Sequence, residues 1–105
     1  MSKERARFWK ALSLMDQSGV PIIESLGIAA QEADEKLKSG ISEAVRGVEN
    51  RGSRTVMADA MEKQPETFSA FEIAMIKAGE RSGDIGVAAG KLAEFFREFG
   101  SSSQT

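Results

Sequence analysis

The stretch Gly79-Glu80-Arg81-Ser82-Gly83-Asp84-Ile85 separates two apolar helical patterns near the end of the chain. Gly83 can adopt the left-handed conformation that ends a helix, because it has no Cβ atom to clash with the backbone. Asp84 follows directly and is a good N-cap for a second helix. The stretch therefore predicts a tight corner between two helices. The residues of this structural motif are Gly79, Glu80, Ser82, Gly83 and Asp84.

Glu80 is the unusual residue of the corner, because it lies in the last turn of the incoming helix. The C-terminal end of a helix dipole disfavours negative charge, so this carboxylate needs a compensating partner. Candidates are the unpaired N–H groups at the start of the following helix, the hydroxyl of Ser82, and a basic side chain such as Arg46 or Arg51. We predict that Glu80 is a structural carboxylate that ties its helix to another element.

Apolar residues recur at helical spacing on both sides of the corner. The helix before it, capped by Thr67 or Ser69, is expected to bury Phe68, Phe71, Met75, Ile76 and Gly79. The helix after it is expected to bury Ile85, Ala88, Ala89, Leu92, Phe96 and Phe99. Gly86 and Gly90 lower the helix propensity of this last segment, which suggests that it packs closely against another helix.

Four further helices are predicted upstream. The first covers residues 3–18, and its apolar face is formed by Phe8, Ala11, Leu12 and Met15. Gly19 and Pro21 make the turn to a second helix, which ends near residue 32. A third helix begins at the N-cap residue Asp34. A short fourth helix, capped by Ser53 or Thr55, is expected to contain Val56, Met57, Ala60 and Met61.

The fold class that follows is all-α. No segment shows the period-two alternation of a strand, and short turns separate the predicted helices. We therefore expect a single antiparallel bundle of about six helices joined by short turns. Residues 1–100 are expected to form one helical domain, and the serine-rich residues 101–105 a flexible tail.

Composition argues against several classes of function. The 105 residues include 14 basic and 16 acidic side chains, a net charge of −2, whereas nucleic-acid binding normally needs a concentrated positive face. The sequence has no cysteine and no histidine, so thiolate metal sites and the usual general base are absent. We find no phosphate loop or nucleophile arrangement and expect neither an enzyme nor a bound cofactor. No apolar run approaches the ~20 residues of a membrane helix.

Glu32, Asp34 and Glu35 form an acidic group that suggests a metal site, because hard cations bind clustered carboxylates. The group lacks the 12-residue loop spacing of an EF-hand. Acidic residues are also favourable at the start of a helix. We therefore interpret the group as a solvated helix cap and expect no metal.

The corner carries a family resemblance. Its pattern, Gly-Glu-x-Ser-Gly-x-(Leu/Ile), resembles the cytoplasmic domains of the inner-membrane platform proteins of type II secretion and type IV pilus assembly. Three other parts of the chain agree with that family in order. They are Phe8-x-x-x-Leu12 with Ser18-Gly19-Val20-Pro21, then Glu24-Ser25-Leu26, then Gln64-Pro65-Glu66-Thr67-Phe68. The resemblance spans about Phe8 to Phe96.

The resemblance implies a non-enzymatic scaffold domain at the cytoplasmic face of the bacterial inner membrane. Its partners would be the assembly ATPase and other inner-membrane machine proteins, with some self-association, and its membrane spans would lie outside this chain. The methionine close to the opening helix favours the first of the family's two cytoplasmic copies. The alternative function is a free-standing soluble helical adaptor that binds a partner helix.

Four apolar residues that lie outside the predicted core stripes are candidates for partner contact. They are Trp9, Ile23, Ile73 and Phe95. Trp9 and Leu14 both lie off the apolar stripe of the first helix. They are either the rim of a wide buried face or an exposed contact surface. Aromatic residues are common among interface hot spots, and we hypothesise that partner contact uses chiefly Trp9, Ile23 and Ile73.

The start of the chain is basic. Lys3, Arg5, Arg7 and Lys10 stand against Glu4, an excess of three positive charges. Such a run is usually a solvated helix end. Next to an inner membrane it could also rest against anionic head groups.

Overall fold

The computed structural model describes residues 2–50 and 57–100, and within these ranges it contains helices and turns but no strand. The helices are α1 (Ser2–Gln17), α2 (Ile22–Ala29), α3 (Glu35–Asn50), α4 (Met57–Glu62), α5 (Ala70–Ser82) and α6 (Ile85–Phe95). A 3₁₀ turn, η1 (Ala30–Glu32), extends α2, and a π-helical turn, η2 (Phe96–Gly100), extends α6. The predicted all-α bundle of about six helices is confirmed. The tail predicted at 101–105 lies outside the described residues.

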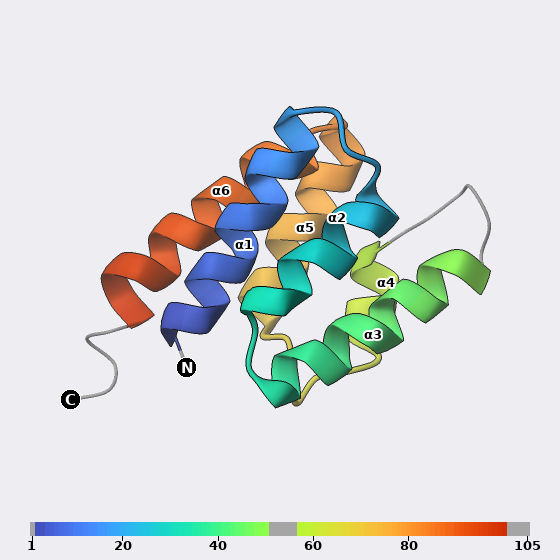
Figure 1. Cartoon of the computed structure of the whole chain (residues 1–105), viewed down its shortest axis with the longest axis horizontal. Helices are drawn as coiled ribbons and strands as arrows, with labels where there is room; N and C mark the ends of the chain where they lie inside the picture. The colour runs from blue at the N-terminus through green and yellow to red at the C-terminus, as the bar shows by residue number, and fades with distance from the viewer. Residues whose placement is uncertain (1, 51–56, 101–105) are drawn as a thin grey trace.

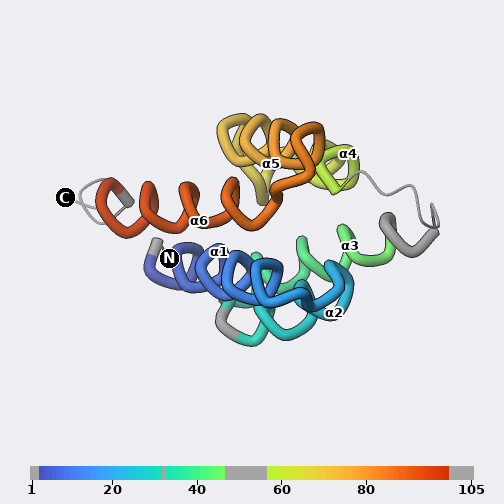
Figure 2. Tube along the Cα trace, turned by 90° about the horizontal axis from the view of Figure 1, so that it is seen from above, coloured from blue at the N-terminus to red at the C-terminus, as the bar shows by residue number. Residues whose placement is uncertain are grey.

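The two halves of the chain face each other across the core. Figure 2 shows α1, α2 and α3 on one side of the molecule and α4, α5 and α6 on the other. The longest contact runs between α1 and α6, which lie side by side although they stand at opposite ends of the sequence (Figure 1). The start of α1 and the end of α6 are therefore at the same end of the molecule.

The core is built mainly from large apolar side chains of α1, α2, α3, α4 and α6. Phe8 and Trp9 are both wholly buried and pack edge to face, with ring centroids 4.8 Å apart. Their largest fully buried apolar companions are Leu12, Leu26, Leu37, Met57, Met61, Ile76 and Leu92. Burial of a side chain of this size contributes about 1.5–3 kcal/mol, so this set supplies the main driving force for folding.

The predicted corner joins α5 to α6. Gly83 has φ 77°, in the left-handed region, and the N–H of Asp84 donates to the carbonyl of Gly79 at 2.8 Å. The carboxylate of Asp84 accepts the N–H of Val87 at 3.3 Å and so caps α6. The hydroxyl of Ser82 donates to the carbonyl of Gly79 at 3.3 Å. The chain reverses here within two residues, because each helix end is satisfied locally.

Close packing of α6 is confirmed at both of its glycines. A Cβ on Gly86 would lie 2.7 Å from Oδ2 of Asp16, and one on Gly90 would lie 3.1 Å from Oγ of Ser13. Both neighbours belong to α1. The small residues of α6 thus let the two backbones approach, as the loss of helix propensity suggested.

Two predicted core positions are wrong. Phe71 and Phe99 are exposed, although both were placed on buried stripes. In α5 the buried position next to Phe71 is taken by Glu72, and Phe99 lies in η2, where the turn departs from α-helical spacing. Phe68 is buried as expected but precedes α5, whose N-cap is Ser69. Residues 53, 55 and 56, predicted for the fourth helix, lie outside the described residues.

Replacement of Gly79 tests how closely α5 and α6 pack at the corner. A Cβ there would lie 2.9 Å from Cβ of Ala88 and 3.2 Å from Cα of Ile85, both fixed to the α6 backbone. We expect Gly79→Ala to lower the free energy of unfolding by about 1–3 kcal/mol. Chemical denaturation of the variant and the wild type measures this loss of stability.

The matched control is Gly27→Ala in the middle of α2, where an added Cβ meets nothing within 4 Å. Gain of helix propensity alone should raise stability there by about 0.5–1 kcal/mol. Equal effects at the two glycines would show that α5 and α6 do not pack as closely as described.

Candidate functional site

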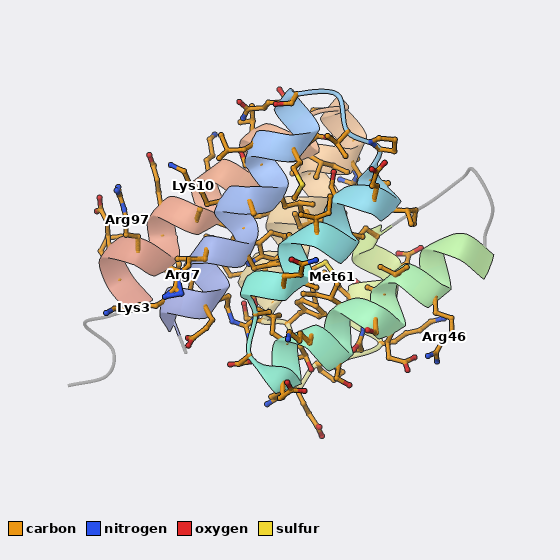
Figure 3. The ribbon with its side chains drawn as sticks, viewed as in Figure 1. Lys3, Arg7, Lys10, Arg46, Met61 and Arg97 are labelled. Carbon is orange, nitrogen blue, oxygen red and sulfur yellow. The ribbon has the colours of Figure 1, made fainter. Side chains whose placement is uncertain are left out.

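Glu80, the central carboxylate of the corner, contacts the start of α4. One oxygen accepts the backbone N–H of Met57, and the other accepts that of Ala58 at 3.3 Å. Glu80 therefore ties α5 to another element, as predicted. Of the candidate partners, the start of α6 does not supply the N–H groups, and α4 supplies them instead. Arg46 pairs with Glu43 on its own helix at 2.9 Å (Figure 3). Arg51 lies outside the described residues.

Two opposing effects act on the charge of Glu80. Burial, the larger, raises the pKa of Glu80 above its usual value, because a desolvated carboxylate is less stable than a hydrated one. The hydrogen bonds from Met57 and Ala58 lower the pKa, and the nearby Asp59 raises it further. Glu80 lines a small cavity of about 230 Å³ together with Asp16 and Ile22. The site joins α4, α5 and the end of α1.

A second carboxylate, Asp16, fastens α1 to α6. Its Oδ2 accepts the N–H of Gly86 at 2.9 Å, so it stabilises the start of α6 from a different helix. The hydroxyl of Ser13, one turn earlier, donates to the carbonyl of Gly86 at 2.6 Å. The sequence analysis did not identify either residue, because their partners lie about seventy positions away along the chain.

Glu72 is the third structural carboxylate, and the sequence analysis missed it. It is almost wholly buried. Its Oε1 accepts the N–H of Ser69 at 2.8 Å and the hydroxyl of Ser69 at 3.1 Å. Its Oε2 accepts Nη1 of Arg5 and Nε1 of Trp9, each at 2.9 Å. The pattern Ser-x-x-Glu is the signal that could have revealed its capping role at the start of α5.

The residues proposed for partner contact fall into three classes. Trp9 is wholly buried and bonded to Glu72, so of its two interpretations the wide buried face is correct and the exposed contact surface is wrong. Ile23 and Ile73 are half-buried and pack against the core. Phe95 is partly exposed, and Leu14 is exposed. Of the four predicted contact residues, Phe95 therefore has the most accessible side chain.

Phe95 belongs to an aromatic cluster that we define as Phe71, Phe95 and Phe99. Its rings are 45%, 37% and 58% exposed in that order. The ring of Phe95 lies tilted against that of Phe71, with centroids 4.8 Å apart, and against that of Phe99, with centroids 5.3 Å apart. Three adjoining exposed aromatic rings form an apolar surface of the kind that marks interaction sites.

On its other flank α6 lines an open groove with α1, which we name the α1/α6 groove. Its volume is about 870 Å³. Leu14 and Val87 lie at one end of it. Figure 3 shows Lys3, Arg7 and Lys10 of α1 on the same side of the molecule as Arg97 of η2. The basic start of the chain, noted in the sequence, thus forms part of a two-helix surface.

Comparison with known proteins identifies the family. Residues 8–101 match the family model described as type II secretion system (T2SS), protein F. The chain belongs to this family. The matched range includes every helix described above, apart from the first turns of α1.

Two curated relatives are similar to the chain over most of its length. The chain is 33% identical over 85 residues to type II secretion system protein F of Pseudomonas aeruginosa, an alignment that covers 80% of this chain and 20% of that protein. It is 31% identical over 91 residues to type IV pilus assembly protein PilC of Myxococcus xanthus, covering 87% of this chain and 21% of that one. The chain therefore spans about a fifth of the length of these curated relatives.

Neither a metal site nor a membrane span is found in the part of the chain that the structure describes. No group of three acidic side chains there is arranged to hold a metal ion. The carboxylate of Asp34 accepts the N–H of Leu37 at 2.8 Å, which is a helix cap. Among the described helices of this family member, none is long and apolar enough to cross a bilayer.

Replacement of Glu80 tests how the corner is held to α4. In Glu80→Gln the amide keeps one acceptor oxygen but turns an NH₂ donor toward a backbone N–H. We expect a loss of about 1–2 kcal/mol in the free energy of unfolding at neutral pH. Chemical denaturation of the variant and the wild type measures the loss.

The pH dependence of this difference separates the two effects on Glu80. The pKa of Glu80 is raised in the folded state, so the folded protein holds this proton more tightly than the unfolded chain does. Protonated Glu80 therefore contributes stability that is fully present below its ordinary pKa. This contribution is lost as the pH rises through the folded-state pKa. The difference between wild type and Glu80→Gln should therefore shrink as the pH rises. A difference that grows instead would mean that the bonds to α4 outweigh desolvation.

Proposed function

We propose that this chain is a scaffold domain of an inner-membrane platform protein in type IV pilus assembly or type II secretion. It works at the cytoplasmic face of the bacterial inner membrane and contacts the assembly ATPase and other machine proteins. The family match over residues 8–101 is the observation that carries the proposal. The two relatives are named for these two machines.

The chemistry of the domain supports a role in binding rather than catalysis. Glu72, Glu80 and Asp16, the carboxylates with the most developed surroundings, are each bonded to donors that hold one helix to another. General acid–base catalysis needs a titrating group that can reach a substrate. These three groups instead stabilise the arrangement of the helices, which is what a scaffold requires.

We assign the contact with the ATPase to the aromatic cluster. Phe71, Phe95 and Phe99 bring together three helical elements, α5, α6 and η2, so that their relative positions are set by the fold. Aromatic side chains contribute large contact areas with little loss of conformational entropy, and they are enriched among interface hot spots. The alternative function, a free-standing helical adaptor, would bind a partner helix but no ATPase.

Substitution within the cluster tests the assignment. We expect Phe95→Ser to abolish retention of the assembly ATPase in a pull-down on the immobilised chain, because it removes the central ring of the cluster. Since Phe95 is partly exposed, the melting temperature of the variant should fall by only a few degrees.

The matched control is Ile28→Ser, which removes an exposed apolar side chain on α2, away from the cluster. It should leave retention of the ATPase unchanged. If the two variants retain the ATPase equally well, the cluster is not its contact surface. If wild-type chain retains none, the adaptor function is favoured.

A further inference from the structure

The α1/α6 groove lies between two antiparallel helices. Ser13 and Asp16, near the end of α1, bond Gly86 at the start of α6. At the opposite end, the guanidinium of Arg5 lies over the ring of Phe96, 5.9 Å from its centroid. The two helices therefore run in opposite directions along the groove. A groove between two packed helices has the shape that receives a third helix.

The walls of the groove are basic although the chain as a whole is acidic. Five Lys and Arg side chains line it against one acidic residue, Glu94, whereas the whole chain has a net charge of −2. Lys10 on α1 and Lys91 on α6 are both exposed. Within the described residues neither forms an ion pair, so their charges are open to a partner.

Charge and apolar surface are separated along the groove. Leu14 and Val87, both exposed, lie at the end where α1 finishes and α6 begins. Lys3 and Arg7 lie at the end where α1 begins and α6 finishes, together with Arg97, which pairs with Glu98 at 3.7 Å. One end of the groove thus favours apolar contact, and the other favours negative charge.

We propose that the α1/α6 groove binds an amphipathic helix whose N-terminal half is apolar and whose C-terminal half is acidic. The helix lies parallel to α6, with its acidic half between the basic residues of α1 and η2. This orientation also places the negative end of the bound helix dipole among the cations. The proposal rests on the proposed function for the source of the helix, a partner protein of the machine.

The shape of the site favours a helix over a lipid surface. Anionic head groups would neutralise the basic side chains. They would leave Leu14 and Val87, at the far end of the groove, without an apolar partner. Ala93, which is almost wholly buried, also lines the groove. A helix with one apolar half and one acidic half contacts both ends of the groove at once.

Two synthetic peptides of about 14 residues test the polarity, a length that spans roughly 21 Å as a helix. They have the same composition, with leucines on one face, but one has its glutamates in the C-terminal half and the other in the N-terminal half. Fluorescence anisotropy against the 105-residue chain measures their affinities. The first peptide should bind at least about tenfold more tightly, and its affinity should fall as salt is added.

Charge reversal in the groove provides the matched test. Lys10→Glu with Lys91→Glu should weaken the first peptide roughly tenfold or more. The control, Lys36→Glu with Lys63→Glu, makes the same change of charge at exposed sites outside the groove. It should leave the affinity nearly unchanged.

Four results would overturn the proposal. The first is equal binding of both peptides, and the second is an equal effect of the two double variants. The third is binding to vesicles of equal phosphatidylcholine and phosphatidylglycerol that depends on Lys10 and Lys91, in the absence of peptide binding. The fourth is self-association, measured by sedimentation, that Leu14→Ser abolishes and that neither peptide can compete away. Each leaves the platform function standing, because retention of the ATPase is tested separately at Phe95.

Discussion

The carboxylate of Glu72 is the point at which the first and fifth helices are joined, and it is nearly sealed from water. Burial of an isolated carboxylate is costly, so it is tolerated here only because both oxygens are satisfied. Two donors come from Ser69 at the start of α5, and two come from Arg5 and Trp9 of α1. The bond from Trp9 also fixes the indole that, with Phe8, occupies the centre of the core. The position of α1 is therefore set by chemistry as well as by apolar packing.

The arrangement of the two proposed contact surfaces depends on the position of α1. α1 forms one wall of the α1/α6 groove, and Asp16 and Ser13 hold α6 against it. The corner at Gly83 then fixes α5 relative to α6, and Glu80 fixes α5 relative to α4. The aromatic cluster and the groove lie on the two flanks of α6. The proposed scaffold function would need these two surfaces at a constant separation, and the three carboxylates connect the helices that carry them.

The sequence predicts what local rules determine. The corner follows from Gly83 and Asp84, because a left-handed glycine and an N-cap act within a few residues. The helix to which Glu80 bonds could not be predicted, since α4 lies more than twenty positions earlier in the chain. Trp9 was misplaced because a single apolar stripe assumes one buried face, whereas α1 packs against both α2 and α6. Its buried arc is wider than the stripe.

A double-mutant cycle between Trp9 and Glu72 measures how strongly the buried carboxylate joins α1 to α5. The free energies of unfolding of Trp9→Phe, Glu72→Gln and the double variant are compared with that of the wild type. If the indole and the carboxylate join α1 to α5 as described, the two substitutions are coupled by at least about 1 kcal/mol. Effects that add to within about 0.5 kcal/mol would mean that the bond between the indole and the carboxylate does not help to hold α1 against α5.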